Sequence, residues 1–175
     1  MFKALTQLPN GKLRIAIASL LTLNAFLYAA LDSLIAAVDA FAWLALLLSF
    51  ELETAGLPPT IREKSLHNIR NALLVIISLV TLAYLLTGDI LNFANSVLWI
   101  GLIGLLEMEV RAPVLVEAHN KLYWLASVFV FTGLLAMVAL SFWFGAVLDG
   151  FNNMLWIVAF ALVEVDLFSF LKFKK

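Results

Sequence analysis

The fold is decided by residues 95–109, which read NSVLWIGLIGLLEME. Trp99 follows the opening asparagine by four residues, and two glutamates, Glu107 and Glu109, lie at the end of the stretch. Every residue between Trp99 and Glu107 is apolar or glycine. Because charged side chains are costly in hydrocarbon, two carboxylates at the end of such a run indicate a structural or functional role.

The same pattern occurs three times in the chain. Residues 39–53 read DAFAWLALLLSFELE, and residues 152–166 read NNMLWIVAFALVEVD. The three tryptophans of the pattern, Trp43, Trp99 and Trp156, recur with a period of 56 to 57 residues. Self-similarity at a fixed period is the signature of a repeated structural unit. We therefore expect three copies of one helical hairpin, with repeats 14–53, 70–109 and 121–166, arranged with approximate threefold pseudo-symmetry about the membrane normal.

The composition is that of a membrane protein. Hydrophobic residues make up 64% of the 175 residues and charged residues 13%, against about 45–50% and about 25% in soluble domains. Six apolar segments are each close to the roughly 20 residues that cross a bilayer as a helix. We expect an all-α protein that forms a single transmembrane domain over residues 1–175. Its six transmembrane helices are expected at 14–31, 34–52, 70–87, 90–110, 122–144 and 151–171.

The basic residues predict the orientation of the chain. All eleven Lys and Arg lie before residue 15, within 54–70, within 111–121 or after residue 170. The turns at 31–33, 87–89 and 148–153 carry none. By the positive-inside rule, both termini are expected on the cytoplasmic side. We expect an integral protein of a bacterial or archaeal cytoplasmic membrane, in contact with lipid.

The two acids of each copy are expected to have different roles. At 100° per residue, two residues that are two positions apart do not share one helical face. Folding each hairpin about its turn brings the first acid level with a basic residue, and buried charges must be paired to be tolerated. The third pair requires a longer turn around 142–152. The expected ion pairs are Arg14–Glu51, Arg70–Glu107 and Lys121–Glu164.

The second acids, Glu53, Glu109 and Asp166, have no obvious basic partner in their own repeat. Three acids at one level would form a ring, and acidic rings select cations. Intramembrane carboxylates also relay protons. Glu164 belongs to the same candidate pathway because its pair is expected to lie inside the cytoplasmic half of the membrane. A hard divalent cation would also suit these oxygen ligands, and the sequence leaves the metal open.

The first residues of the motif are expected near the outer surface, as an interface or an outer gate. Asp39, Asn95 and Asn152 suit N-caps or turns. The three motif tryptophans suit the aromatic belt of the outer interface. The alternative is that these tryptophans pack inward, above the site that the acids surround.

The leading hypothesis is a small channel or transporter for a cation or a proton. The alternative is a non-catalytic structural or assembly subunit of a larger membrane complex, in which the acids form ion pairs within hairpins. We expect no enzymatic activity and no cofactor, because the chain lacks cysteine and shows no Ser–His pair and no nucleotide motif. We also expect no binding of nucleic acid, whereas a homo-oligomer or a larger complex stays open.

Overall fold

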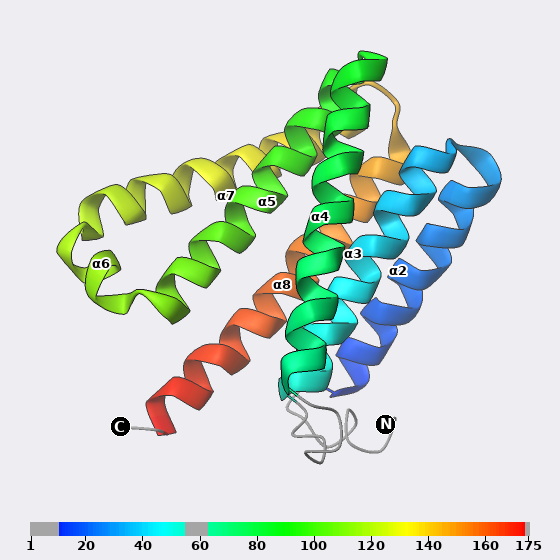
Figure 1. Ribbon diagram of the computed structural model, residues 1–175. Coiled ribbons are helices and arrows are strands. Elements are labelled where there is room, and N and C mark those ends of the chain that lie inside the picture. Colours follow the sequence, from blue (N-terminus) through cyan, green and yellow to red (C-terminus); the bar gives the residue numbers. More distant parts are fainter. Residues whose placement is uncertain (1–10, 55–62, 174–175) are drawn as a thin grey trace. The chain divides into compact units, whose positions relative to one another are not determined.

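The computed structural model describes residues 11–54 and 63–173, with side chains for 12–49, 68–109 and 111–162. These ranges are helical except for short turns, and they contain no strand. They form seven helices (Figure 1). The helices are α2 (Gly11–Leu31), α3 (Leu34–Thr54), α4 (Glu63–Thr87), α5 (Ile90–Arg111), α6 (Pro113–Ala118), α7 (Asn120–Trp143) and α8 (Val147–Phe173).

Four of these helices contain a stretch that is long and apolar enough to cross a membrane. The stretches are Lys12–Leu31, Asn68–Thr87, Ile90–Glu109 and Asn120–Trp143. The apolar parts found in α3 and α8, Leu34–Ser49 and Val147–Leu162, are shorter. The four long apolar helices indicate a membrane-embedded protein.

All six segments expected to be helical are helices, with large differences in the bounds of two of them, α8 and α4. Helix α8 begins at Val147 rather than at 151, which leaves only residues 144–146 between α7 and α8. Gly145 has φ +77, a conformation that glycine adopts without steric cost. The Phe142 ring packs directly against Gly150 and lies 5.5 Å from the Phe151 ring, which holds this polar stretch in the helix. The longer turn expected around 142–152 therefore does not form.

The structure contains one helix that the sequence did not predict and another that is longer than predicted. The basic connection 111–121 contains α6, in which Pro113 lies in the first turn, where proline is compatible with a helix. None of the residues of α6 is buried. Helix α4 begins at Glu63, seven residues before the predicted start at residue 70.

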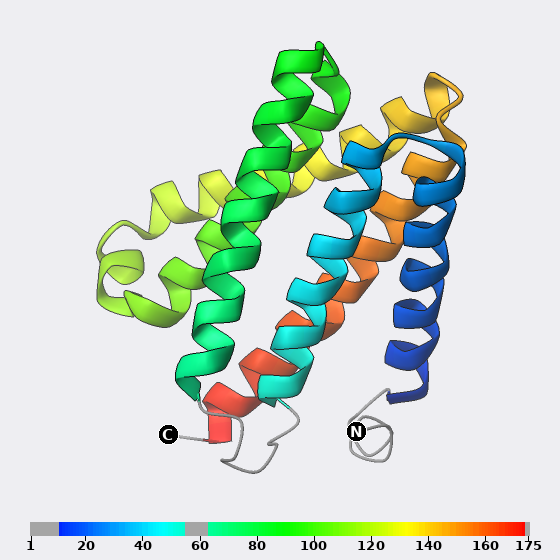
Figure 2. The ribbon, with the colours of Figure 1, turned by 45° about the vertical axis from the view of Figure 1, so that its right-hand side comes forward.

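Contacts between residues divide the chain into two compact units. Unit 1 comprises Met1–Val80 with Met154–Lys175, and unit 2 comprises Thr81–Asn153. In unit 1, α2 and α3 form an antiparallel hairpin (Figure 2). The part of α8 in unit 1 contacts both helices of this hairpin, through Arg14 in α2 and Trp43 in α3. The single transmembrane domain expected from the sequence stays a prediction.

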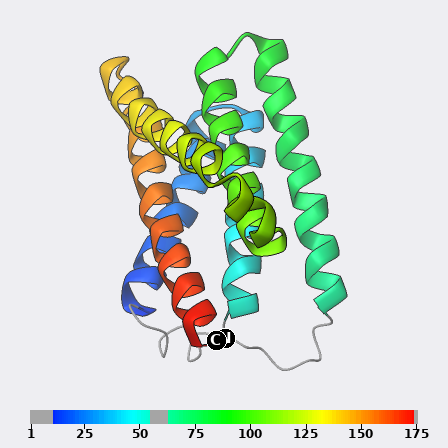
Figure 3. The same cartoon turned by 90° about the vertical axis from the view of Figure 1, so that its left-hand side faces the viewer.

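Unit 2 is organised by the packing of α5 against α7, which α6 connects. Gly133 of α7 packs closely against the side chain of Leu98, and Gly101 of α5 lies beside Val130. Small residues permit such close approach of membrane helices. Figure 3 shows the tight turn that joins the end of α4 to the start of α5. Gly88, with φ +80, lies in this turn.

The starts of α3, α5 and α8 correct the expected N-caps. Leu34, Ile90 and Val147 each begin a helix five residues before the motif residues Asp39, Asn95 and Asn152. The predicted N-cap roles of these three residues are therefore wrong. Residues nearer the turns bind the free N–H groups instead: Ser33 Oγ accepts from Ala36 N at 3.1 Å, and Asp89 Oδ1 accepts from Asn92 N at 3.2 Å.

Replacing Gly133 with leucine is expected to weaken the packing of α7 on α5. A Cβ at position 133 would lie 2.8 Å from Leu98 Cδ2, so a larger side chain pushes the helices apart. Overpacking of this kind costs about 1–3 kcal/mol, and we expect a loss of about 2 kcal/mol in the free energy of unfolding. Unfolding in detergent measures it. The control is Gly104→Leu in α5, where a Cβ meets nothing within 4 Å; equal stability of the two variants contradicts this packing.

Candidate functional site

The first acid of the central motif, Glu107, forms an ion pair with Arg111, one helical turn further along α5. Ion pairs at this spacing are common on helices. The Arg111 side chain is 57% exposed, so solvent screens the pair. The expected partner, Arg70, belongs to unit 1, whereas Glu107 belongs to unit 2. The Arg70–Glu107 pair stays a prediction, and Arg111 is the basic partner that the structure gives.

A double-mutant cycle with Glu107→Gln and Arg111→Gln is expected to give a weak coupling. For an exposed pair at this spacing we expect about 0.3–0.5 kcal/mol. The same cycle with Arg70→Gln measures the alternative pair in the same protein. A coupling of Glu107 to Arg70 that is several times larger than its coupling to Arg111 contradicts the assignment to Arg111.

The second acid, Glu109, has a neutral partner. Tyr123 Oη donates a hydrogen bond to Glu109 Oε2 at 2.8 Å and lies 3.4 Å from the Leu105 carbonyl oxygen. A phenol carries one proton, so the shorter contact takes it. Both side chains are partly buried. Among the described residues, Glu109 has no ion-pair partner. In this copy of the motif, Glu107 has a cationic partner in Arg111, whereas Glu109 has a neutral partner in Tyr123.

A buried cation lies in unit 1. Arg14 is 7% exposed although it lies in an apolar stretch, and its Nη2 donates to the Leu162 carbonyl oxygen at 2.8 Å. Glu164 and Asp166 follow Leu162 by two and four residues, so both lie within about one helical turn of it. Across the two-residue turn of the α2–α3 hairpin, position 14 is also level with Glu51. Arg14 therefore lies at the level where the first and third motifs carry their acids.

The side chains of four acids in these motifs lie outside the described residues. Their backbones are helical, in α3 and α8. They are Glu51, Glu53, Glu164 and Asp166. The Arg14–Glu51 pair therefore stays a prediction. The Lys121–Glu164 pair is not tested either, but the longer turn around 142–152 that level pairing requires does not form, and the Lys121 side chain is exposed at the start of α7. Among the side chains that are described, no group of three or more His, Asp or Glu could hold a metal ion.

The motif tryptophans are inside the protein. Trp43, Trp99 and Trp156 are 7%, 4% and 6% exposed, whereas Trp143 is 85% exposed. In unit 1 the rings of Trp43 and Trp156 meet edge to face with centroids 6.1 Å apart. This burial favours the inward-packing alternative over the aromatic belt. Their role as an outer gate stays a prediction.

Two residues at this site, Arg111 and Tyr123, were not predicted from the sequence. The sequence did offer a signal for Arg111, which follows Glu107 by the four residues that place side chains on one helical face. It offered none for Tyr123, because that contact depends on how α6 connects α5 to α7. Tyr123 is the residue that gives Glu109 a neutral hydrogen-bond partner.

Comparisons with protein-family models, with curated proteins and with solved structures find no match for this chain. The candidate functional site is Glu109 with its hydrogen-bond partner Tyr123.

Proposed function

We propose that this protein is a small membrane channel or transporter for a cation or a proton. The observation that carries the proposal is the Glu109 carboxylate. It is partly buried at the end of a helix apolar enough to cross a membrane, and its partner is the neutral phenol of Tyr123. A carboxylate without a cationic partner can bind a cation or take up and release a proton. The pathway residues are Glu109, its equivalents Glu53 and Asp166, and Glu164.

Two observations support three equivalent hairpins. Helices α3, α5 and α8 start at the same position of the motif. The same three positions of each motif are also buried: the tryptophan, and the residues three and four positions after it. These buried residues are Trp43, Leu46 and Leu47, then Trp99, Leu102 and Ile103, then Trp156, Ala159 and Phe160. Equal starts and equal buried faces are what a repeated unit requires.

Six spans follow from the same repeat. Helices α3 and α8 have 21 and 27 residues, enough for about 30 Å of helix or more. Each is equivalent to α5, which contains the apolar stretch Ile90–Glu109. With six spans, both termini lie on the side that carries the basic connections, which is the cytoplasmic side. A cytoplasmic membrane of a bacterium or archaeon is the proposed location.

The alternative function is a structural subunit of a larger membrane complex. It is favoured by the fact that both acids of α5 have partners within unit 2, Arg111 and Tyr123. The variants Tyr123→Phe and Glu109→Gln distinguish the structural function from the transport function. A purely structural role predicts that Tyr123→Phe and Glu109→Gln lower stability alike, while the protein in liposomes shows no flux of its own.

Flux into liposomes tests the proposed function. The full-length protein is expected to dissipate an imposed proton, sodium or potassium gradient, and Glu109→Gln is expected to abolish most of that flux. Glu107→Gln is the matched control, since it changes the same charge two residues away on the same helix. Equal flux for Glu109→Gln and the unmodified protein, with equal insertion, contradicts the proposed pathway.

A further inference from the structure

The Tyr123 hydroxyl lies against two acceptors on α5. Glu109 Oε2 is 2.8 Å from Tyr123 Oη, and the Leu105 carbonyl oxygen is 3.4 Å from it. Leu105 and Glu109 are four positions apart, so they lie on one face of α5. Both helices belong to unit 2, and α6 connects the ends that carry these residues (Figure 1). The packing of α7 on α5 therefore offers one phenol two acceptors.

The shorter contact is the one that an ionised Glu109 requires. A hydrogen bond to a carboxylate is shorter and stronger than one to a neutral carbonyl, so the phenol O–H points to Oε2. The Leu105 carbonyl accepts from the Glu109 N–H, as in any α-helix. A carbonyl oxygen has two lone pairs, so one of them remains for the phenol.

A neutral Glu109 also has its partners in this arrangement. The protonated carboxyl gains an O–H group, which donates to Tyr123 Oη. The phenol O–H then rotates about its C–O bond toward the Leu105 carbonyl oxygen. Neither protonation state leaves a polar group of this pair without a partner, so neither incurs the cost of an unsatisfied buried group.

The same arrangement suits a metal cation poorly. Metal-cation sites are lined by acceptor oxygens, whereas here a hydroxyl proton is directed at the carboxylate oxygen that would bind the metal. The other titratable side chains near the connection of α5 to α7 are paired or exposed. Glu107 and Arg111 pair with each other, and the exposed ones are Glu117, His119 and Lys121.

We infer that Tyr123 is a positioning residue that makes Glu109 a site for protons rather than for metal cations. This inference rests on the proposed function and names the transported ion. The Glu109 carboxylate takes a proton from hydronium on one side of the membrane and releases it to water on the other. Tyr123 keeps its own proton and exchanges one acceptor for the other, so only O–H bonds form and break.

Flux into liposomes tests the transported ion with the unmodified full-length protein. It is expected to dissipate a pH gradient and to leave sodium and potassium gradients decaying as in empty liposomes. Tyr123→Phe is expected to lower the proton flux by about tenfold, the effect of losing one hydrogen bond to a charged group.

The matched control is Tyr84→Phe, which is expected to keep the proton flux. It removes the same hydroxyl from a buried tyrosine of unit 2. The Tyr84 carbonyl oxygen accepts from Asp89 N at 2.9 Å, so this residue lies at the turn before α5, at the opposite end of that helix from Glu109.

Infrared difference spectra between acid and alkaline pH add a readout that a loss of stability alone would not change. The carboxyl C=O band that Glu109→Gln removes belongs to protonated Glu109. In Tyr123→Phe this band is expected at higher frequency, because the carboxyl group loses its hydrogen bond to the phenol. A band at the same frequency in both proteins contradicts the pairing of protonated Glu109 with Tyr123.

The inference is overturned if Tyr123→Phe, inserted to the same extent, conducts protons like the unmodified protein. It is also overturned if sodium or potassium crosses and protons do not; this comparison uses the unmodified protein, so it decides even if Tyr123→Phe does not insert. Sodium or potassium flux that Glu109→Gln abolishes refutes this inference and leaves the proposed function standing. Proton flux that Glu109→Gln leaves unchanged refutes both.

Discussion

Replacing Trp156 with alanine is expected to lower the free energy of unfolding by about 3 kcal/mol. The Trp156 ring is 6% exposed and lies 6.1 Å from the Trp43 ring and 6.0 Å from the Phe160 ring. In a membrane, lipid is as apolar as the protein interior, so the loss comes from packing and ring contacts rather than from transfer out of water. We therefore expect a value at the low end of the range of about 3–5 kcal/mol that truncation of a core tryptophan to alanine costs.

The control for this prediction is Trp143→Ala. Trp143 is 85% exposed at the end of α7, and its loss is expected to change the free energy of unfolding by less than about 0.5 kcal/mol. Both variants are compared by reversible unfolding of the full-length protein in the same detergent. If the two substitutions lower the free energy of unfolding equally, packing of Trp156 does not stabilise unit 1.

Replacing Arg14 with methionine is expected to cost about 2 kcal/mol. The guanidinium is buried and donates to the Leu162 carbonyl oxygen, and a hydrogen bond from a charged group contributes about 1.5–3 kcal/mol. Methionine keeps much of the apolar length of the side chain, so the change reports the loss of the polar contacts of Arg14, among them the one between α2 and α8. Unfolding in detergent measures it.

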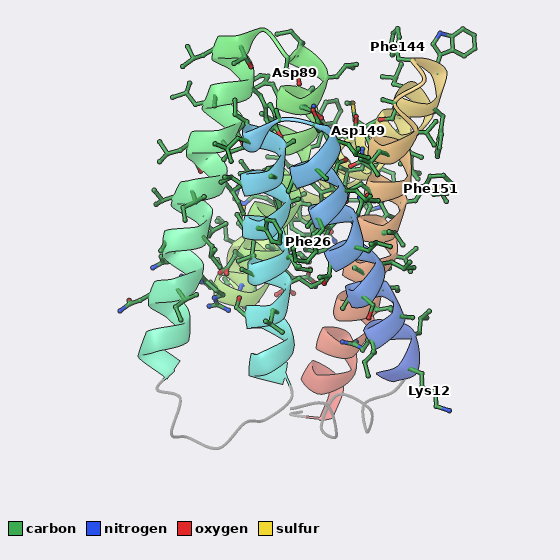
Figure 4. The ribbon with its side chains drawn as sticks, turned by 90° about the vertical axis from the view of Figure 1, so that its right-hand side faces the viewer. Lys12, Phe26, Asp89, Phe144, Asp149 and Phe151 are labelled. Atoms are coloured by element: carbon green, nitrogen blue, oxygen red, sulfur yellow. The ribbon has the colours of Figure 1, made fainter. Side chains whose placement is uncertain are left out.

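Lys12→Met is the matched control for Arg14. Lys12 lies two residues away on α2 with an exposed side chain (Figure 4), so its loss is expected to leave stability nearly unchanged. Arg14→Lys keeps the charge but loses the planar fork of donors. Its free energy of unfolding is expected to lie between those of Arg14→Met and Lys12→Met. Equal stability of Arg14→Met and Lys12→Met contradicts a structural role for this contact.

The helices were predictable because apolar length and turn residues act locally. The run Thr87-Gly88-Asp89 places a glycine suited to positive φ directly before a residue that caps α5, and the predicted boundary between 87 and 90 is the observed one. The prediction failed where packing overrides local preference. Residues 147–150 look like a turn, but Phe142 packs against Gly150 and the stretch is helical.

The candidate site was predictable in part. The acid pair of α5 follows from the repeated motif, and its two members do have different partners. The partner of Glu109 was not predictable, because Tyr123 reaches it only through the antiparallel packing of α7 on α5. The sequence did not decide whether the motif tryptophans are buried, because tryptophan suits both an interface and a core.

The most direct test of the central claim is gradient-driven flux in liposomes that contain Glu109→Gln or Glu107→Gln protein. The proposed pathway predicts that Glu107→Gln protein conducts like the unmodified protein, whereas Glu109→Gln protein, inserted to the same extent, conducts little above empty liposomes. Equal flux for the two variants would contradict the claim that Glu109 lies on a cation or proton pathway.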